Sequence, residues 1–490
     1  MVVMISHPTH LLAALLPAAL LLAAPAFAET AAPARPPNVV YFILDDIGYH
    51  ELSCMGHPEM RTPRIDQLAK EGVRFTQMLA GAPVCAPTRC SLLTGKHAGH
   101  MTVRANLGST APQASIRADE QTLGSMFKAA GYATGGFGKW GIGVRGSTGV
   151  PEKHDFDIFF GYYDQTHAHT YYPRYLVNNS VEVPLDGNTG DPTTGKTFSQ
   201  YRIVEETKKF IAANQDRPFF AYCAWTPPHG LWGMPESDPA WDLYKDKPWR
   251  TGQKTDKDSR IYAAMISMAD RQIGEVLDQL KSLGIAENTI VVFSGDNGGQ
   301  PYFNSKDQPN GIFSPNVDPH TGTKFRGGKG DLYEGGLRVP FIVAWPGNIV
   351  GGRVSTHLGY FPDMAPTLAE LTGTKDLPGT DGVSIAPTLL GTPGQQEHDY
   401  LYWEHLGMTA VRFGDMKAVL PKGGKDQAAR WALYDLSKDI SETKDISAEH
   451  PDIVARAAAV AKREHEPVRP GVILDKELAG KDRQFEPKEK

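Results

Sequence analysis

The sequence is poor in several features that would each indicate a particular class of protein. Four cysteines occur in 490 residues, Cys54, Cys85, Cys90 and Cys223, and their spacing fits neither a disulfide-dense scaffold nor a CxxC metal site. The formal net charge is −6 at pH 7 and no block rich in lysine and arginine occurs, so nucleic-acid binding is not expected. Any anionic substrate must therefore be held by a local cationic site.

Long apolar runs are also scarce. One run, at residues 11–24, is followed by a small-residue segment that ends at Ala28. It is too short for a membrane span and is typical of an export signal, so residues 1–28 are predicted to be a signal peptide. No lysine or arginine precedes the run, which leaves a wrongly assigned start codon or a retained anchor as the alternatives. The expected location is periplasmic or secreted, and no other run predicts a membrane span.

Four apolar runs of strand length each end in ionisable or amide residues. The runs are Asn38–Leu44 before Asp45 and Asp46, Tyr132–Phe137 before Lys139, Pro218–Ala224 before His229, and Thr289–Ser294 before Asp296 and Asn297. Amphipathic stretches at 65–72, 120–130, 201–213 and 262–283 lie between them. This alternation predicts an α/β fold with a large mixed, mostly parallel sheet sandwiched by helices. Ligands bind beyond the carboxyl ends of such strands, so one shared crevice is expected.

The pattern changes after Pro387. Short apolar runs occur at 400–403, 408–413 and 431–434, and a helical stretch follows at 451–463. We therefore expect a catalytic domain at residues 37–387 and a smaller C-terminal α+β domain, built on an antiparallel sheet, at residues 395–485. The charged tail from Asp475 is expected to be loosely ordered.

Two acidic and amide pairs are candidate metal ligands. Asp45 and Asp46 follow one predicted strand, and Asp296 and Asn297 follow another. Carboxylate and amide oxygens are preferred by hard divalent ions, so Ca²⁺ is predicted here, with Mg²⁺ as the alternative. A single such pair is more often a turn or a helix cap, and the prediction depends on the two pairs meeting.

A family resemblance is carried by Cys85-Ala86-Pro87-Thr88-Arg89 and the following Cys90-Ser91-Leu92-Leu93-Thr94-Gly95. This stretch resembles the signature of the type I, formylglycine-dependent sulfatases of the alkaline phosphatase superfamily. Segments similar to other parts of that family are Thr62–Ala69, Gly72–Phe75, Gly138–Trp140, Gly328–Gly330, Tyr333–Gly336 and Trp431–Leu436. The resemblance covers nearly the whole mature chain and implies an arylsulfatase-like hydrolase.

The resemblance implies a mechanism. In the family, a formylglycine-generating enzyme oxidises the cysteine, here Cys85, to an aldehyde whose hydrate attacks sulfur and then expels sulfate by collapsing back to the aldehyde. With Cys85 consumed, three cysteines remain, so at least one free thiol is expected. Arg89 would hold the hydrate, and Lys139 and Lys329 would neutralise the sulfate oxygens. His229 would protonate the leaving alcohol. The two acidic and amide pairs would hold the metal that also contacts formylglycine.

One position departs from the family pattern. Many members carry a histidine two residues after the lysine of Gly-Lys-Trp, where it is thought to accept a proton during sulfate release, whereas this chain has Gly141. His167 and His169 are candidates for that task or for binding substrate. A packed, aromatic-rich loop is the alternative interpretation of the segment that holds them.

The expected activity is hydrolysis of a sulfate monoester, with either an aryl group or a sulfated glycan as substrate. Aromatic residues near 162–175 suit stacking on a ring of either kind. Two alternatives stay open. One is a phosphodiesterase or phosphonate-monoester hydrolase of the same superfamily, because phosphate and sulfate are both tetrahedral. The other is a catalytically silent protein that binds sulfated glycans.

Overall fold

The computed structural model describes residues 1–4, 35–107, 113–249, 256–423 and 430–482. Most of the predicted signal peptide, residues 5–28, lies outside these ranges, and so do residues 483–485 of the predicted C-terminal domain. Met1–Arg35 and Pro36–Lys490 are separate units. The helices and strands of the described residues all lie in the second unit.

The second unit is built on a large mixed sheet. Its strands are β1 (Asn38–Asp45), β2 (Val73–Leu79), β3 (Ala133–Lys139), β4 (Ile158–Tyr162), β5 (Tyr175–Asn178), β6 (Val181–Pro184), β7 (Phe219–Pro228), β8 (Thr289–Gly295), β9 (Phe341–Ala344) and β10 (Arg353–Tyr360). Within the described residues these ten strands lie in the order β10-β2-β9-β8-β1-β7-β3-β4-β5-β6. The central strands β8, β1, β7, β3 and β4 run parallel, and β9, β5 and β6 pair antiparallel with their neighbours. The predicted fold class is confirmed.

Helices cover both faces of this sheet. They are α1 (Pro63–Glu71), α2 (Cys85–Thr94), α3 (Leu123–Ala129), α4 (Ser199–Ala213), α5 (Pro239–Asp242), α6 (Asp256–Ser282), α7 (Glu334–Leu337), α8 (Met364–Thr372) and α9 (Ala386–Leu390). On one face, Val40 and Phe42 of β1 share a core with α1, α4 and α6. On the other, Val39 and Tyr41 share a core with α2, α3 and α8. Burial on both faces explains why β1 is apolar almost throughout.

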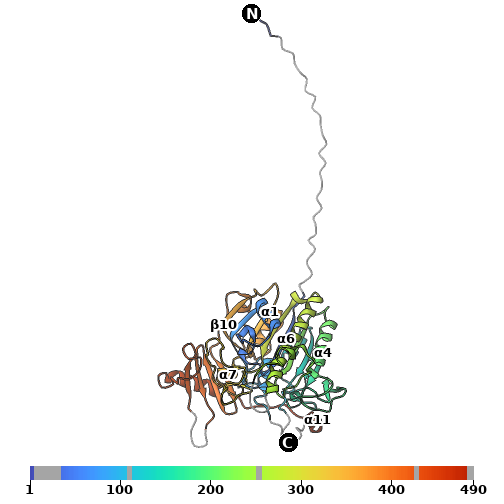
Figure 1. Ribbon diagram of the computed structural model, residues 1–490. Coiled ribbons are helices and arrows are strands. Elements are labelled where there is room, and N and C mark those ends of the chain that lie inside the picture. Colours follow the sequence, from blue (N-terminus) through green and yellow to red (C-terminus); the bar gives the residue numbers. More distant parts are fainter. Residues whose placement is uncertain (5–34, 108–112, 250–255, 424–429, 483–490) are drawn as a thin grey trace. The chain divides into compact units, whose positions relative to one another are not determined.

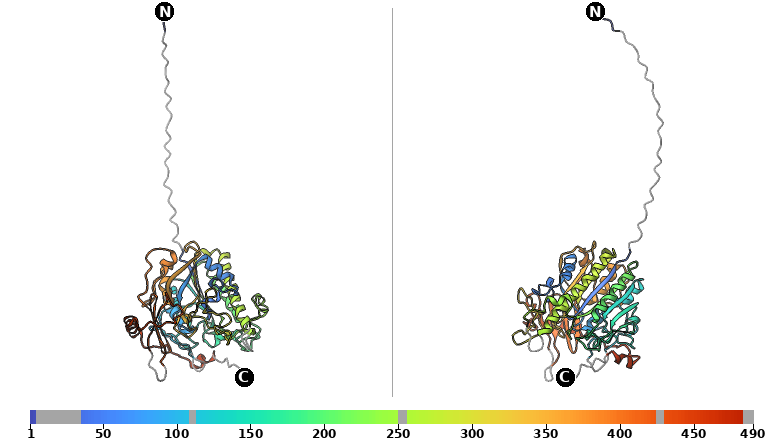
Figure 2. Two further views of the ribbon diagram at one scale, coloured as in Figure 1. Left: turned by 60° about the vertical axis from the view of Figure 1, so that its left-hand side comes forward. Right: turned by 45° about the vertical axis from the view of Figure 1, so that its right-hand side comes forward.

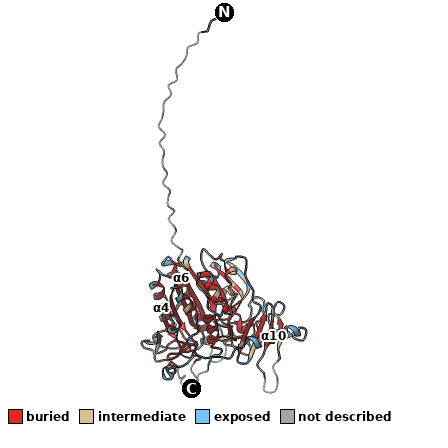
Figure 3. Ribbon diagram, turned by 180° about the vertical axis from the view of Figure 1, so that it is seen from behind, coloured by how far each residue is buried: buried red, intermediate tan, exposed pale blue. Residues whose placement is uncertain are grey.

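The arrangement is visible from several sides. Figures 1 and 2 show α4 and α6 side by side over the sheet, and Figure 3 shows the strands buried beneath helices whose outer surfaces are exposed. None of the helices in the described part of the chain combines the length and apolar character that a membrane span requires. All four cysteines are free thiols, which agrees with the expected free thiol.

A second, smaller sheet follows. Its strands β11 (Leu401–His405), β12 (Met408–Phe413), β13 (Met416–Leu420) and β14 (Ala432–Asp435) are antiparallel and lie in sequence order. Helix α10 (Pro451–Glu464) packs on one face of this sheet (Figure 3). The other face packs against Leu332 and Leu337, which precede and end α7.

The prediction of a loosely ordered tail from Asp475 is wrong for the residues that the structure describes. Helix α11 (Lys476–Lys481) begins one residue later, with the Asp475 side chain accepting a hydrogen bond from the Leu478 N–H. Asp482 is buried, and one of its carboxylate oxygens accepts a hydrogen bond of 2.9 Å from Arg145 Nε. Charge alone suggested disorder, but a buried arginine elsewhere in the chain supplies the partner.

A buried cluster of charges lies where the smaller sheet meets α7. Glu334, the first residue of α7, pairs with Arg338 at 2.6 Å, Lys417 at 3.1 Å and Arg412 at 3.5 Å. Lys417 also lies 3.0 Å from Glu442. Burial raises the pKa of Glu334, but Lys417 and Arg338 outweigh this, so the pKa of that carboxyl lies well below its usual range.

Candidate active site

Four strand ends meet at one edge of the large sheet. Asp45 is the last residue of β1, Lys139 the last residue of β3, and His229 follows the last residue of β7. Because β1 pairs in parallel with both β7 and β8, residue 45 lies beside the segments that follow them. Asp46 adopts a left-handed backbone conformation, with φ 63°, which turns the chain at the edge of the sheet. The predicted residues of all four strands are therefore neighbours.

The acidic and amide residues contact one another. The Asp46 N–H donates to Asp296 Oδ1 at 3.0 Å, and Asn297 Nδ2 donates to Asp46 Oδ1 at 2.9 Å. Asp45, Asp46, Asp296 and Asn297 are fully buried. Burial, with the charge of Asp45 beside it, raises the pKa of Asp296 to about 7. The site thus crowds three carboxyl groups into a space without exposed surface.

Cys85 begins α2 and faces this carboxylate group. Its Sγ–H donates to Asp45 Oδ1 at 3.2 Å. Burial and the charge of Asp45 raise the pKa of the Cys85 thiol to about 12. At neutral pH the side chain is therefore a neutral thiol rather than a reactive thiolate.

Three cations surround the carboxylates. Arg89, one turn after Cys85 on α2, donates to Asp296 Oδ2 at 3.1 Å and to the backbone carbonyl of Lys139 at 2.8 Å. Lys139 Nζ donates to Asp45 Oδ2 at 2.5 Å. Lys329, from the long segment between β8 and α7, donates to Asp46 Oδ2 at 2.7 Å. Positive groups from three separate parts of the chain thus converge on one site.

Two histidines complete the group. His229 Nε2 lies 3.2 Å from Lys329 Nζ, and His229 Nδ1 contacts the carbonyl of Gly230. Nδ1–H therefore donates to Gly230, and neutral Nε2 accepts from Lys329. Burial and Lys329 lower the pKa of His229 to about 4. The ring of His169 stacks on that of His229, with centroids 4.0 Å apart and planes 12° apart.

The structure separates the two histidines of the 165–173 loop. His169 lies against His229, and the pKa of His169 is well below its usual value because of burial and the neighbouring His229. His167 instead packs against Tyr162 and Tyr175, with ring centroids 5.0 Å away in each case. The aromatic-loop interpretation therefore holds for His167, and the substrate-contact interpretation is kept for His169.

Sequence reasoning missed two residues of the site. Tyr302 donates its hydroxyl to Asp46 Oδ2 at 2.5 Å, and the amide of Gln165 lies 3.3 Å from the position that a Cβ on Gly141 would take. Both residues lie in loops, where no periodic pattern marks a side chain as buried or directed inward. An aromatic residue four positions after Gly298 in a polar loop was the available signal for Tyr302.

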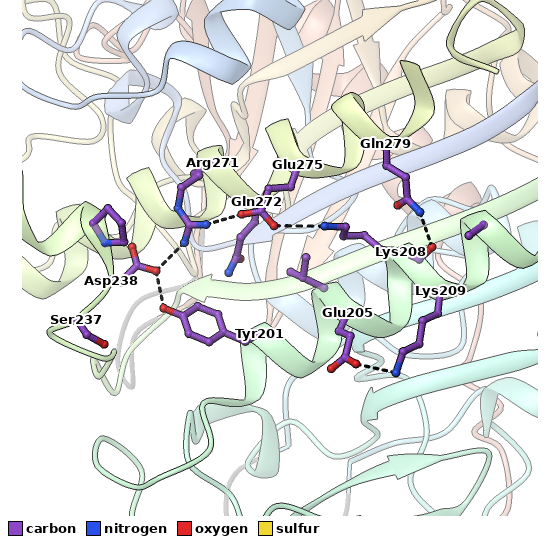
Figure 4. Close-up of a pocket in the computed structure, with 13 residues that line it drawn as sticks. Tyr201, Glu205, Lys208, Lys209, Ser237, Asp238, Arg271, Gln272, Glu275 and Gln279 are labelled. Atoms are coloured by element: carbon purple, nitrogen blue, oxygen red, sulfur yellow. Dashed lines mark hydrogen bonds and ion pairs between the residues drawn. The ribbon is translucent and has the colours of Figure 1, made fainter. Parts of the chain in front are cut away.

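A separate cavity of about 690 Å³ lies between α4 and α6, and Figure 4 shows its lining side chains. Its charged groups are paired with one another, as in Arg271 with Asp238 at 2.6 Å and Lys209 with Glu205 at 2.7 Å. Among the described residues that line it, none belongs to the predicted site. The candidate active site is therefore at the edge of the large sheet rather than in this cavity.

Comparison with known proteins decides the family. The sulfatase family model matches residues 37–374, and the model for the C-terminal part of N-sulphoglucosamine sulphohydrolase matches residues 328–463. The chain belongs to the sulfatase family. This sulfatase is 31% identical to human arylsulfatase A over 464 residues, covering 86% of this chain and 85% of the relative. It is a sulfuric ester hydrolase.

Two further comparisons agree. The sulfatase is 31% identical to N-acetylgalactosamine-6-sulfatase of Canis lupus familiaris over 423 residues, covering 81% of this chain and 74% of the relative. The crystal structure of Ps i-CgsB in complex with k-i-k-neocarrahexaose matches with a TM-score of 0.72 at 23% identity, covering 93% of this chain and 98% of that one. The last comparison shows that the two proteins share a fold.

Proposed function

We propose that this sulfatase hydrolyses sulfate monoesters with a hydrated formylglycine, made from Cys85, as its nucleophile. The observation that carries the proposal is the meeting of Cys85, three carboxylates and three cations at one buried edge of the sheet. A sulfate group brings negative charge that fixed cations can hold, and such preorganised charge is the main source of catalysis in reactions of this kind.

The state of Cys85 supports its conversion. A thiol whose pKa is raised to about 12 is a poor nucleophile at neutral pH. A hydrated formylglycine supplies one hydroxyl that attacks sulfur and a second through which the aldehyde re-forms as sulfate leaves. We infer that a formylglycine-generating enzyme makes this group, as the resemblance implies.

The residues present fit a divalent metal ion. Asn297 Oδ1 is buried and lacks a hydrogen-bond partner anywhere in the described residues, and crowding raises the pKa of Asp296. Both features are relieved by a cation with oxygen ligands. Asp45, Asp46, Asp296 and Asn297 would hold Ca²⁺, with Mg²⁺ as the alternative. The ion would act as a Lewis acid beside the sulfate oxygens.

The remaining residues have separable tasks. Lys139 and Lys329 would neutralise the sulfate oxygens, and Arg89 would hold the group at position 85 through the end of α2. His229 Nε2 would give its proton to the leaving alcohol oxygen. The imidazole is neutral before substrate arrives, and the negative charge of an entering sulfate favours the protonated form. His169, stacked on His229, would contact the substrate.

The substrate class is an aryl sulfate or a sulfated carbohydrate. Among the relatives, one is named for N-acetylgalactosamine 6-sulfate and another for aryl sulfates, and these names favour the same two classes here. We also propose that residues 1–28 direct export to the periplasm or the medium, and that residues 37–387 and 395–485 are the catalytic and C-terminal domains.

The mass of the peptide that contains residue 85 tests the proposal in protein from a host that can mature it. Exchange of the thiol sulfur for an aldehyde oxygen is the expected result. Cys85→Ala should lower kcat/KM for an aryl sulfate by at least about 10⁴-fold. An unmodified thiol in active protein contradicts the mechanism, and retention of glycan binding with no hydrolysis in the wild type would support the silent binder.

A second measurement separates the rival enzyme. Matched aryl sulfate and aryl phosphate esters share a leaving group, so their kcat/KM values differ only through the acid group. Preference for the sulfate is expected. A preference for the phosphate ester, or for a phosphonate monoester, would instead assign the chain to the phosphodiesterase and phosphonate-monoester hydrolase alternative.

A further inference from the structure

Gln165 is a buried amide that the proposed mechanism does not use. Only 4% of its surface is exposed, and its Oε1 has no hydrogen-bond partner in the part of the chain that the structure describes. A buried oxygen without a donor is costly, and native structures rarely keep one without a reason. The amide therefore indicates a donor that binds there.

Asn106 fixes which atom of the amide is free. The Ala86 N–H donates to Asn106 Oδ1 at 3.0 Å, so this oxygen is an acceptor. The atom of Gln165 that faces it, at 3.3 Å, must then be the donor Nε2. Exchanging the nitrogen and oxygen would place two acceptors against each other. Oε1 is therefore the unpartnered atom.

The amide lies between two parts of the active site. Through Asn106 it joins Ala86, which follows Cys85 in the first turn of α2. Its other side lies over Gly141, two residues after Lys139, where a Cβ would come within 3.3 Å of its Cδ and Nε2. Gly141 has φ +79°, which a side chain disfavours. Glycine at 141 thus leaves the space that the carboxamide fills.

Chemistry limits the donor that Oε1 can accept from. The sulfate group of a substrate and the carboxylates of the site present only acceptor oxygens, and a free aldehyde carries no O–H. Hydroxyls of a carbohydrate substrate are also donors, and the KM measurement below distinguishes them. A hydrated aldehyde carries two hydroxyls, each of them a donor. Because Asn106 links the amide to the Ala86 N–H in the first turn of α2, the side chain at position 85 is the hydroxyl source that this placement favours.

We propose that Gln165 Oε1 accepts a hydrogen bond from a hydroxyl of the hydrated formylglycine at position 85 and so favours the hydrate over the aldehyde. In the hydration itself, the oxygen of water bonds to the carbonyl carbon and its second proton moves to the former carbonyl oxygen. Gln165 takes no proton, and is a positioning residue. The inference rests on the proposed function, since it requires the aldehyde.

The test measures the aldehyde rather than turnover. Matured protein is treated with methoxyamine, which captures the free aldehyde as an oxime, and the rate is followed by intact mass. Gln165→Leu keeps the bulk of the side chain but removes the acceptor, so capture should be roughly tenfold faster than in the wild type. Hydrolysis of an aryl sulfate should slow by a similar factor.

Gln200 offers a matched control. It is buried, its Oε1 also lacks a partner among the described residues, and its Nε2 donates to an amide oxygen, Gln272 Oε1, at 3.2 Å. It lies on α4, outside the site. Gln200→Leu should leave both the capture rate and hydrolysis unchanged, so a general effect of removing a buried amide is separated from the proposed one.

Asn106→Ala is the second variant. Asn106 is exposed, so the fold tolerates the change, while Gln165 loses the partner that orients it. Capture should again be faster, by a few-fold. If neither variant alters capture relative to the wild type, the inference is wrong. Unchanged capture with a raised KM would assign Oε1 to a substrate hydroxyl and also overturn it. Absence of any oxime in the wild type would instead contradict the proposed function.

Discussion

Two buried clusters of acids and bases in this sulfatase have different purposes. The cluster around Glu334 joins the smaller sheet to α7, and its charged groups pair with one another or with neighbouring amide and backbone oxygens. Its one carboxylate oxygen without a hydrogen bond among the described residues, Glu442 Oε1, lies 3.0 Å from Lys417 Nζ. The cluster around Asp45 and Asp296 leaves buried polar atoms such as Asn297 Oδ1 and His169 Nε2 without partners among the described residues. Both contain three cations.

The difference teaches that buried charge alone does not mark an active site. A cluster whose charged groups all have an ion-pair partner within the chain holds parts of the fold together, because breaking it would leave an unpaired charge in the interior. A cluster that leaves buried polar atoms without partners can bind a group from outside the polypeptide, which under the proposed function is a metal ion and a sulfate group. Loss of a residue should therefore cost stability in the first cluster and activity in the second.

Among the variants that compare the two clusters, the largest effect is expected from Asp296→Asn. Losing this carboxylate weakens the metal site and the contact with Arg89, so kcat/KM for an aryl sulfate should fall by about 10³-fold. Stability should change little, because one of three crowded negative charges is removed. Kinetics, calcium content and urea unfolding check this. A fall of less than about tenfold in activity would remove Asp296 from the proposed site.

Glu334→Gln should give the opposite result. It removes the carboxylate that pairs with Arg338 and Arg412 and leaves Lys417 with Glu442 alone, and unfolding free energy should fall by about 3–5 kcal/mol. Activity per folded molecule should be retained. Glu205→Gln, which breaks an exposed pair with Lys209, is the control and should cost less than about 1 kcal/mol. Equal losses in the two variants would contradict the structural role.

The partly buried Lys329 and the buried Lys417 allow the sharpest comparison within one residue type. Lys329→Gln should reduce kcat/KM by roughly 10²-fold with a small change in stability, because its partner Asp46 keeps Asn297 and Tyr302. Lys417→Gln should reduce stability and leave kcat/KM unchanged. Thermal unfolding and kinetics of the two variants, measured side by side, check the distinction. If both variants lose activity without losing stability, the comparison fails.

A smaller effect concerns His100, whose Nδ1 lies 2.9 Å from Asp381 Oδ1. The hydrogen bond to Asp381 raises the pKa of His100. A histidine whose pKa is higher in the folded than in the unfolded state stabilises the fold. This contribution is fully present below the unfolded-state pKa of about 6.5, and it is lost as the pH rises through the folded-state pKa. His100→Gln should therefore lose about 1 kcal/mol at low pH and little at high pH. Urea unfolding of the wild type and of His100→Gln across about pH 5 to 9 checks this. If the pair is unimportant, the unfolding free energies of the two proteins will depend on pH in the same way.

Much of the fold could be predicted from the sequence. The apolar run at 38–44 became β1, and the amphipathic stretch at 451–463 became α10 within one residue. Such elements are visible because a strand covered on both faces is a continuous apolar run, whereas a helix buried on one face shows a helical period. Strand β13 (Met416–Leu420) was missed, since its run is short and carries Lys417, a charge that only the cluster around Glu334 explains.

The candidate site could be predicted only where residues follow strands or match a family signature. Asp45 and Asp296 stand 251 positions apart, yet parallel strands bring their ends together, and that rule is readable from sequence. Tyr302 and Gln165 depend on how long loops fold back, which no local pattern records. That these two residues belong to the site is shown only by contacts in the structure, such as the hydrogen bond from the Tyr302 hydroxyl to Asp46.

Helix α2 is enclosed along its whole length, with every residue from Cys85 to Thr94 buried. A second protein cannot bind that segment once it is packed between the sheet and α8. An enzyme that modifies position 85, as the proposed mechanism requires, must therefore work on a nascent or still extended chain. Under that mechanism, a copy that folds before it is modified would be stable, correctly shaped and permanently inert.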